Sequence, residues 1–326
     1  MKIQEKTIIL GQMVLDKVIT EGTLNKEGIF SNNRITIGGP PSFSGIVGHT
    51  LAKIFPWIVQ PLVYAYTCPK AISQLERVLD FKLISKNLIL RPQCPQFRLE
   101  YDNNDSERKL YLKNPPFQFN LNDFNWNLTY SPNVIVGSVY HEFDNSNIFT
   151  FLRDKCSFIA FDPQGCLRQL KSDGKIEFRN WWNPKIMANI DCLKISEGES
   201  KFLNLGTKTD HIIFRILETA VNLVLLTRGK KGAILGRKYI DTNAIILYEV
   251  PAYTAGTVVD ETGAGDVFLS SFIAHFLVHG NELDAVAFAT SVASLLIEER
   301  AFWGKFSKEE ILFRQMRVKS QITELE

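Results

Sequence analysis

The segment from Asp260 to Asp266, DETGAGD, carries the residues best suited to chemistry in this chain. Gly263 and Gly265 flank the small Ala264 just before an apolar stretch that predicts a helix, which leaves several backbone N–H groups without intrahelical partners. These groups and the positive end of the helix dipole favour a bound anion, above all a phosphate. We expect the Asp266 carboxylate to be stabilised there and to accept a proton from an incoming hydroxyl. The segment predicts phosphoryl transfer to an alcohol.

A glycine turn followed by an ordinary helix cap would also account for GAGD on its own. The position of the segment favours the functional interpretation, because it lies at the last strand–helix junction of an alternating chain. In open parallel sheets, ligands bind at the carboxyl ends of the strands. Asp16, Asp162 and the turn 227–229 follow predicted strands in the same way.

Composition restricts the class of protein. The chain has 326 residues, enough for one large α/β domain, and we expect a single domain over residues 1–326. Hydrophobic residues make up 45% and charged residues 22%, which excludes a disordered or fibrous protein. The net charge is only +2 and no long basic tract occurs, so binding to nucleic acid through charge alone is excluded.

The five cysteines are scattered and form no CxxC pair. This spacing argues against a disulfide framework and a zinc cluster, and is typical of a protein of the reducing cytoplasm. The amino terminus carries charges throughout and does not resemble a secretory signal. The longest apolar stretch, 267–278, is too short to span a membrane, so we expect a cytoplasmic protein whose glycosylation sequon at Asn127 is unused.

Short apolar strands alternate with helices along most of the chain. This alternation predicts a parallel sheet covered by helices on both faces. Predicted strands cover residues 7–10, 58–66, 134–136, 157–161, 191–195 and 223–226, and predicted helices include 71–79, 267–278, 283–299 and 308–318.

Two other regions, about 17–37 and 87–113, alternate apolar and polar residues between turn residues. This pattern predicts antiparallel strands that form a small sheet apart from the main body. We expect this sheet to act as a lid that closes over the cleft and excludes water. Its exposed edges offer a surface for a homodimer.

The segment DETGAGDVFLSSF resembles the carboxy-terminal signature of ribokinase-like (PfkB-type) carbohydrate kinases, and the Gly38-Gly39 turn resembles their amino-terminal signature. The order of elements is similar over nearly the whole chain, through LKISEGE and LLTRGKKGA. The resemblance implies a three-layer αβα sandwich with a small β-sheet lid. It also implies an enzyme that uses ATP and Mg²⁺ to phosphorylate a hydroxyl of a small molecule.

The resemblance implies a role for each matching residue. Asp266 corresponds to the catalytic base, and the amides of Gly263, Ala264 and Gly265 correspond to the anion hole. The positions that correspond to substrate binding are Asp16, Gly39 and Asp162. Those that correspond to nucleotide binding are Thr227, Gly229, Gly232 and Thr262, and Glu199 corresponds to a residue that holds Mg²⁺ through water.

Three positions depart from the family pattern. Ser196 replaces the Asn of the Asn-x-x-Glu motif, Phe43 replaces an Asn of the first helix, and no Asn occurs near Thr290 and Ser291. A kinase-shaped binding protein that no longer turns over is therefore the competing class.

The acceptor is less closely specified. GGPPSFSG and the segment Asp162-Pro163-Gln164 followed by Arg168 are similar to the inositol kinases of the family. A cyclitol such as myo-inositol, or a neutral sugar, is therefore favoured as the acceptor. A nucleoside or a keto-deoxy sugar acid is the alternative.

Other signals predict packing. His275 and His279 have the spacing of metal ligands, but no third ligand accompanies them. We expect these histidines, and the aromatic pairs near Trp126 and Trp181, to pack within the fold.

Overall fold

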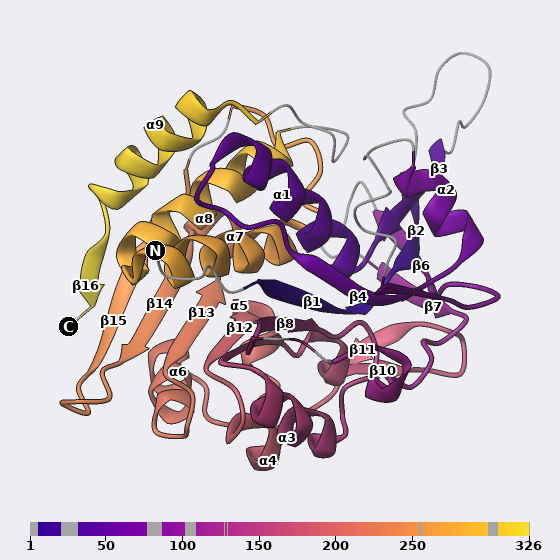
Figure 1. Cartoon of the computed structure of the whole chain (residues 1–326), viewed down its shortest axis with the longest axis horizontal. Helices are drawn as coiled ribbons and strands as arrows, with labels where there is room; N and C mark the ends of the chain where they lie inside the picture. Colours follow the sequence, from indigo (N-terminus) through magenta and orange to yellow (C-terminus); the bar gives the residue numbers. More distant parts are fainter. Residues whose placement is uncertain are drawn as a thin grey trace.

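A computed structural model describes residues 6–20, 32–76, 87–101, 109–126, 128, 130–253, 256–298 and 306–325. In this part of the chain a ten-stranded sheet has the order β16-β15-β14-β13-β12-β9-β8-β1-β4-β5 (Figure 1). The strands from β13 to β5 are parallel, and β14 to β16 are antiparallel. Their bounds are β1 Thr7–Gln12, β4 Leu62–Thr67, β5 Leu88–Leu90, β8 Asn133–Gly137, β9 Phe158–Asp162, β12 Cys192–Ser196, β13 Leu223–Thr227, β14 Ala233–Lys238, β15 Ile245–Val250 and β16 Thr323–Leu325.

Helices cover both faces of this sheet (Figure 1). One face carries α1 (Pro40–Ile54), α7 (Ala264–His279) and α8 (Glu282–Ile297), with α9 (Lys308–Lys319) packed on α8. The other face carries α3 (Ser146–Lys155), α4 (Pro184–Met187) and α6 (Thr209–Leu217). The short helices α2 (Pro69–Leu75) and α5 (Glu197–Ser200) follow β4 and β12. The expected α/β sandwich is thereby confirmed.

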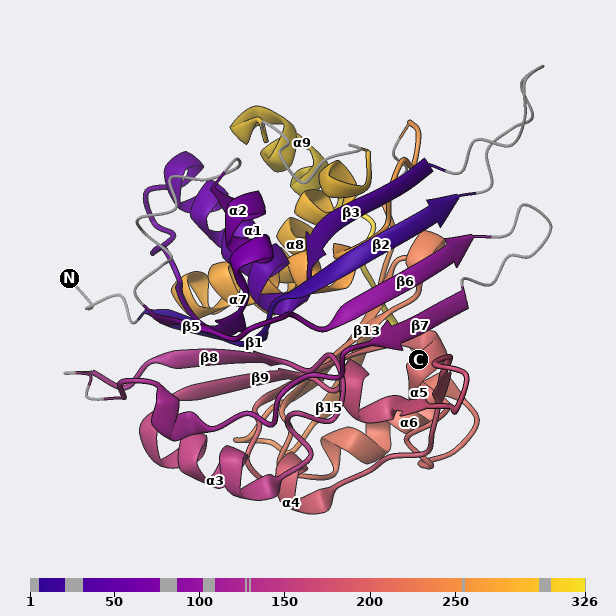
Figure 2. The same ribbon diagram turned by 90° about the vertical axis from the view of Figure 1, so that its right-hand side faces the viewer.

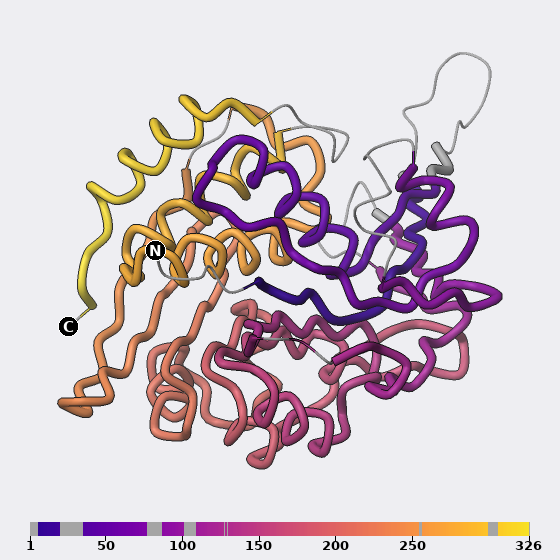
Figure 3. Tube along the Cα trace, in the orientation of Figure 1, coloured from indigo at the N-terminus to yellow at the C-terminus, as the bar shows by residue number. Residues whose placement is uncertain are grey.

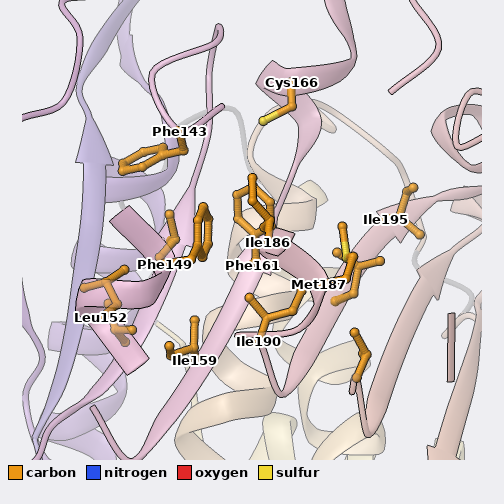
Figure 4. Close-up of a cluster of buried hydrophobic side chains, with 14 of the residues drawn as sticks. Phe143, Phe149, Leu152, Ile159, Phe161, Cys166, Ile186, Met187, Ile190 and Ile195 are labelled. Carbon is orange, nitrogen blue, oxygen red and sulfur yellow. The ribbon is translucent and has the colours of Figure 1, made fainter. Parts of the chain in front are cut away.

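The central strands are apolar because both of their faces are buried. All residues of β8 are buried, and β9 is buried from Ile159 to Asp162. Figure 4 shows the core between the sheet and the helices α3 and α4, where Phe149 and Phe161 meet edge to face with ring centres 4.7 Å apart. This packing holds the carboxyl ends of the strands, and the polar residues that follow them, in fixed positions.

Four other strands form a second sheet with the order β3-β2-β6-β7, which leans out from one end of the main sheet (Figure 2). Its strands are β2 (Val14–Thr20), β3 (Asn32–Gly38), β6 (Gln96–Tyr101) and β7 (Lys109–Lys113). The regions predicted to form a lid, 17–37 and 87–113, contribute to these strands, and residues 21–31 and 102–108 of them lie outside the described residues. We keep the name lid sheet for these four strands.

Several boundaries differ from the predictions. The strand predicted from residue 58 begins at Leu62, after Pro61, because proline has no N–H to donate to a ladder. The helix predicted over 71–79 begins at Pro69, and residues 77–79 lie outside the described part. A small hairpin of β10 (Arg168–Leu170) and β11 (Ile176–Phe178) was not predicted. Strands β14 and β15 pair as an antiparallel hairpin over residues 233–250.

The expectation that the cysteines do not pair is wrong. Cys68 and Cys94 form a disulfide, with their Cα atoms 5.4 Å apart. Cys68 precedes α2 and Cys94 lies just before β6, so the bond joins the main sheet to the root of the lid sheet. Sequence spacing did not reveal the pair because the fold brings the two residues together. Cys156, Cys166 and Cys192 are free and buried.

Candidate active site

A cavity of about 660 Å³ lies at the carboxyl ends of the parallel strands, under the lid sheet. Its walls come from β2 and β6 of the lid sheet, from the ends of β9, β12 and β13, and from the first turn of α7. The structure brings every residue to which the resemblance assigns a role to this one cavity: Asp16, Gly39, Asp162, Glu199, Thr227, Gly229, Gly232, Thr262, Gly263, Ala264, Gly265 and Asp266.

The first turn of α7 presents an open helix amino terminus to the cavity. Gly263 is the N-cap residue, in the left-handed conformation with φ 80°, and no side chain caps the helix. A Cβ at Gly263 would overlap the ring of Phe43, so both the φ angle and the space require glycine. The uncapped amides and the helix dipole together make an anion site. Phe43, which stands where the family has an Asn, therefore packs closely against this turn.

Asp266 lies in the same turn and faces the cavity. Burial raises the pKa of its carboxyl group from 3.8 to about 7, and the neighbouring charge of Asp162 acts in the same direction. Lys194 and Arg168 oppose this rise without cancelling it. Burial and the charge of Asp162 therefore act against the carboxylate form that we expected the turn to stabilise. A carboxylate with this pKa is a suitable proton acceptor near neutral pH.

Lys194 is the main residue of the cavity that sequence reasoning missed. It is buried on β12, and its Nζ lies 2.7 Å from Oδ2 of Asp162. A Cβ on Gly265 would lie 2.6 Å from the same Nζ, so the ammonium is beside the anion site. The negative charges of Asp162, Glu199 and Asp266 outweigh its burial and raise its pKa. A lysine in the otherwise apolar CLKIS strand was the available signal.

Glu199 is fixed by a capping box at the start of α5. Ser196 Oγ accepts from the backbone N–H of Glu199, and the Glu199 carboxylate accepts from the backbone N–H of Ser196 at 2.8 Å. Ser196 in place of the family's Asn is therefore a helix cap. Burial raises the pKa of Glu199, but Lys194 and these hydrogen bonds have the larger combined effect and lower it. Glu199 remains a carboxylate at neutral pH.

Gln164 links Glu199 to the lid side of the cavity. Its Nε2 donates to Glu199 at 3.1 Å, and its Oε1 accepts from Arg168 at 2.7 Å. The buried Arg168 also donates to the carbonyl of Val139 at 2.8 Å, and its guanidinium lies 5.0 Å from the ring centre of Phe97 in the lid sheet. Arg168 therefore contacts both the lid sheet and the main body.

The double glycine 38–39 makes room for Asp16 at this end of the cavity. A Cβ on Gly38 would overlap the Asp16 carboxylate, and Gly39 has φ 85° at the amino terminus of α1. The remaining lid-sheet lining is apolar: Val14, Phe97, Leu99 and Leu110. Asp16, Gln164 and Arg168 are thus the polar side chains of a largely apolar subsite, which we call the lid end.

The other end of the cavity is lined by residues at the end of β13 and in the loop after β15. Thr227 ends β13, and Gly229 and Gly232, both with positive φ, form the turn into β14. Beyond them lies a slot with an aromatic and aliphatic lining from the loop after β15 and from α8: Tyr253, Val258, Ala293 and Ile297. We call this slot the tail end.

The described residues include no group of three or more His, Cys, Asp or Glu side chains arranged to hold a metal ion. The Lys194 ammonium lies 2.7 Å from the Asp162 carboxylate, and the negative charges of Glu199 and Asp266 also act on it. His275 is buried against Trp57, with ring centres 5.3 Å apart, and is a packing residue. Within the described part of the chain, no helix has the length and apolar character needed to cross a membrane.

Residues 183–302 match the model of the pfkB family carbohydrate kinases. Over 158 residues the chain is 27% identical to a probable fructokinase-5 of Arabidopsis thaliana, an alignment that covers 45% of this chain and 45% of that protein. The chain thus spans less than half the length of this curated relative.

Two solved structures are similar to this chain over nearly their whole length. A pyrophosphate-dependent kinase in the ribokinase family, complexed with a pyrophosphate analog and myo-inositol, has a TM-score of 0.74 and 19% identity over 94% of this chain and 99% of that chain. A ribokinase of Thermotoga maritima has a TM-score of 0.70 and 19% identity over 96% and 99%. The fold is therefore ribokinase-like, and the resemblance to pfkB-type carbohydrate kinases is confirmed.

Proposed function

We propose that the chain is a kinase that transfers the γ-phosphoryl group of ATP to a hydroxyl of a small ring polyol. The observation that carries this proposal is the Asp266 carboxyl group, with a pKa of about 7, at an uncapped helix amino terminus. A base with its pKa near the working pH combines the correct protonation state with adequate strength. The adjacent anion site favours the donor phosphate.

The cavity has the lid end, the anion site at the α7 turn and the tail end, and these three subsites support an in-line reaction. The acceptor would occupy the lid end, with its hydroxyl near Asp266, and the donor nucleoside would occupy the tail end. Asp266 would take the hydroxyl proton as the oxygen forms a bond to the γ-phosphorus, and the bond to the β-phosphate oxygen would break to release ADP. The amides of residues 263–265 and the Lys194 ammonium would stabilise the negative charge of the transferred group.

Mg²⁺ would enter with the donor phosphates and neutralise part of their charge. The described carboxylates do not form a direct site for this ion, since Lys194 lies among them. Glu199 accepts hydrogen bonds on both of its oxygens and faces the cavity. It would therefore hold the ion only through water.

A cyclitol such as myo-inositol is our favoured acceptor. Asp16, Gln164 and Arg168 supply both acceptors and donors around one subsite, which suits a ring with hydroxyl groups on every carbon. The fold is shared with a kinase whose solved structure contains myo-inositol. A second acceptor, a nucleoside, is favoured by the apolar side chains Phe97, Leu99 and Leu110 in the same subsite, which suit the flat face of a base.

An ADP-release screen over inositols, hexoses, pentoses, nucleosides and a keto-deoxy sugar acid tests the proposal. The wild type should turn over at least one of these acceptors with ATP, and Asp266→Asn should lower kcat by about 100-fold or more. Unchanged turnover in Asp266→Asn would exclude Asp266 as the base. Calorimetric binding of ATP and an acceptor without ADP release would instead identify a binding relative that does not turn over.

A further inference from the structure

Helix α9, to which the sequence analysis assigned no functional residue, holds the tail end of the cavity in place. Arg314 of α9 is only 8% exposed in its side chain. It donates to Ser294 Oγ at 2.9 Å, and its guanidinium carbon lies 4.6 Å from the ring centre of Tyr253. Ser294 and Tyr253 both line the cavity, one from α8 and one from the loop after β15. One arginine thus contacts two walls of the slot from behind.

The same guanidinium holds the carboxy-terminal end of α8. Two of its nitrogens donate to the two carboxylate oxygens of Glu298, at 2.6 and 2.9 Å, and Nε donates to Glu310 at 2.7 Å. A planar fork bound to both oxygens fixes direction as well as distance, which a lysine ammonium does not. The position of this end of α8 therefore depends on the shape of the Arg314 side chain.

The end of α8 in turn carries the loop that leads into the anion site. The carbonyl of Ile297 accepts from the backbone N–H groups of Val259 and Asp260, at 2.7 and 3.2 Å. Asp260 Oδ1 then accepts from the backbone N–H of Thr262 at 2.9 Å, one residue before Gly263. A continuous set of hydrogen bonds thus runs from Arg314 through α8 to the slot wall near Val258.

A buried ion pair contributes little net stability compared with well-packed apolar residues, because both charges lose their hydration. The value of this arrangement is the fixed geometry of the groups that it joins. Those groups, Tyr253 and the end of α8, both line the cavity at the tail end.

We infer that Arg314 is a positioning residue for the nucleoside part of the phosphoryl donor. It holds Tyr253 and the end of α8 at the separation that lets a flat heterocycle enter between them, while the phosphates bind at the α7 turn. Arg314 does not contact the donor itself. This inference rests on the proposed kinase function, and it adds that the donor is recognised by its base and not by its phosphates alone.

The test compares donors with and without a nucleoside in Arg314→Lys. With the acceptor found in the screen, KM for ATP should rise about tenfold, because Tyr253 and the end of α8 lose the cation–π contact and the bidentate pair that hold them in place. The inhibition constant of inorganic tripolyphosphate, which has the phosphates but no base, should stay within about twofold of the wild-type value. The values of kcat and the acceptor KM should also remain close to those of the wild type.

Arg153→Lys is the matched control. Arg153 has a comparable set of bonds, to Asp191 at 2.6 Å and to the carbonyl of Asn189 at 2.8 Å, but it does not line the cavity or contact its walls. This variant should leave KM for ATP unchanged. Tyr253→Leu removes the ring without altering α9, and should raise KM for ATP while again sparing tripolyphosphate.

Three outcomes would overturn the inference. The first is an unchanged KM for ATP in a folded Arg314→Lys enzyme. The second is an equal loss of affinity for ATP and tripolyphosphate, which would indicate general loosening of the fold. The third is a wild type that uses pyrophosphate in place of ATP. A wild type with no phosphoryl transfer from any donor would instead reject the proposed function itself.

Discussion

The amino-terminal and carboxy-terminal halves of the chain meet at the cavity and contribute different types of residue to it. The carboxy-terminal half supplies the α7 turn, Lys194 and Glu199 from a dense arrangement of buried charges. Residues 1–170, which we call the amino-terminal half, supply the lid end, where Asp16, Gln164 and Arg168 lie among the apolar side chains of the lid sheet. Figure 3 shows the indigo and purple strands of the lid sheet and the yellow helix α9 on different sides of the molecule.

Only the carboxy-terminal half matches the family model, over residues 183–302. This agrees with a division of labour in which one half carries out phosphoryl transfer and the other selects the acceptor. Phosphoryl transfer demands a fixed set of donors and a base, whereas acceptors differ in shape from one enzyme to another. Substitutions in the two halves should therefore change different kinetic constants.

The largest effect is expected at the anion site. Gly263→Ala forces a Cβ into the Phe43 ring at φ 80° and should displace the amides, which lowers kcat by about 100-fold or more. Gly280→Ala is the matched control, because Gly280 has φ 68° at the other end of α7 with nothing within 4 Å of the added Cβ. The control should lose only stability, about 1 kcal/mol. Equal kcat values in the two variants would contradict a catalytic role for the turn.

The pH dependence of kcat should follow the ionisation of Asp266 in the carboxy-terminal half. Asp266 must be ionised to act as a base, and its pKa is about 7, so kcat should fall as the pH decreases through 7. The decrease between pH 8 and pH 5.5 should be about 30-fold. A profile that is flat across this range would exclude Asp266 as the base.

Stability should have the opposite pH dependence. The Asp266 pKa is higher in the folded state than its ordinary value of 3.8, so its contribution is fully present below that value and is lost as the pH rises through about 7. Asp266→Asn should remove this loss. Chemical unfolding should find this variant more stable than the wild type at pH 8 and closer to it at pH 4.

Local patterns were sufficient for the fold and for most of the site. The alternation of apolar strands with helices predicted the sandwich, and DETGAGD predicted the open amino terminus of α7. Both predictions succeed because each depends on residues that are neighbours in sequence. A buried strand is a short hydrophobic run, and the start of α7 requires glycine at Gly263. Asp162 was found because it ends β9, and the carboxyl ends of parallel strands meet at one edge of a sheet, whereas Asp16 lies within β2 of the lid sheet.

The features that failed depend on distant contacts. The Cys68–Cys94 pair forms because the fold brings the residue after β4 close to the residues before β6, and sequence spacing does not predict this contact. The Asp266 pKa depends on burial and on Asp162, a residue more than a hundred positions away. The place of Lys194 in the site could not be predicted, because only the fold brings its ammonium close to Asp162 and Gly265.

A smaller effect is expected at the lid end. Arg168→Lys removes the hydrogen bond to Gln164 and the contact with Phe97, and should raise the acceptor KM about tenfold. KM for ATP should change little. Arg98→Lys is the matched control, since Arg98 also lies over an aromatic ring, Tyr111 at 4.1 Å, but does not line the cavity. A rise in KM for ATP alone would contradict the division between the two halves.

The smallest effect on activity is expected at the root of the lid sheet. The Cys68–Cys94 bond closes a loop with a sequence separation of 26. Cys94→Ser should therefore lower the free energy of unfolding by about 3 kcal/mol, because the unfolded chain gains freedom. Both cysteines lie outside the cavity lining, so kcat should stay within about twofold of the wild type. Urea unfolding of the wild type with and without reductant checks this directly, and the variant should not respond to reductant. A loss of kcat without a loss of stability would instead show that the lid root takes part in phosphoryl transfer, and the two halves would then not be separable.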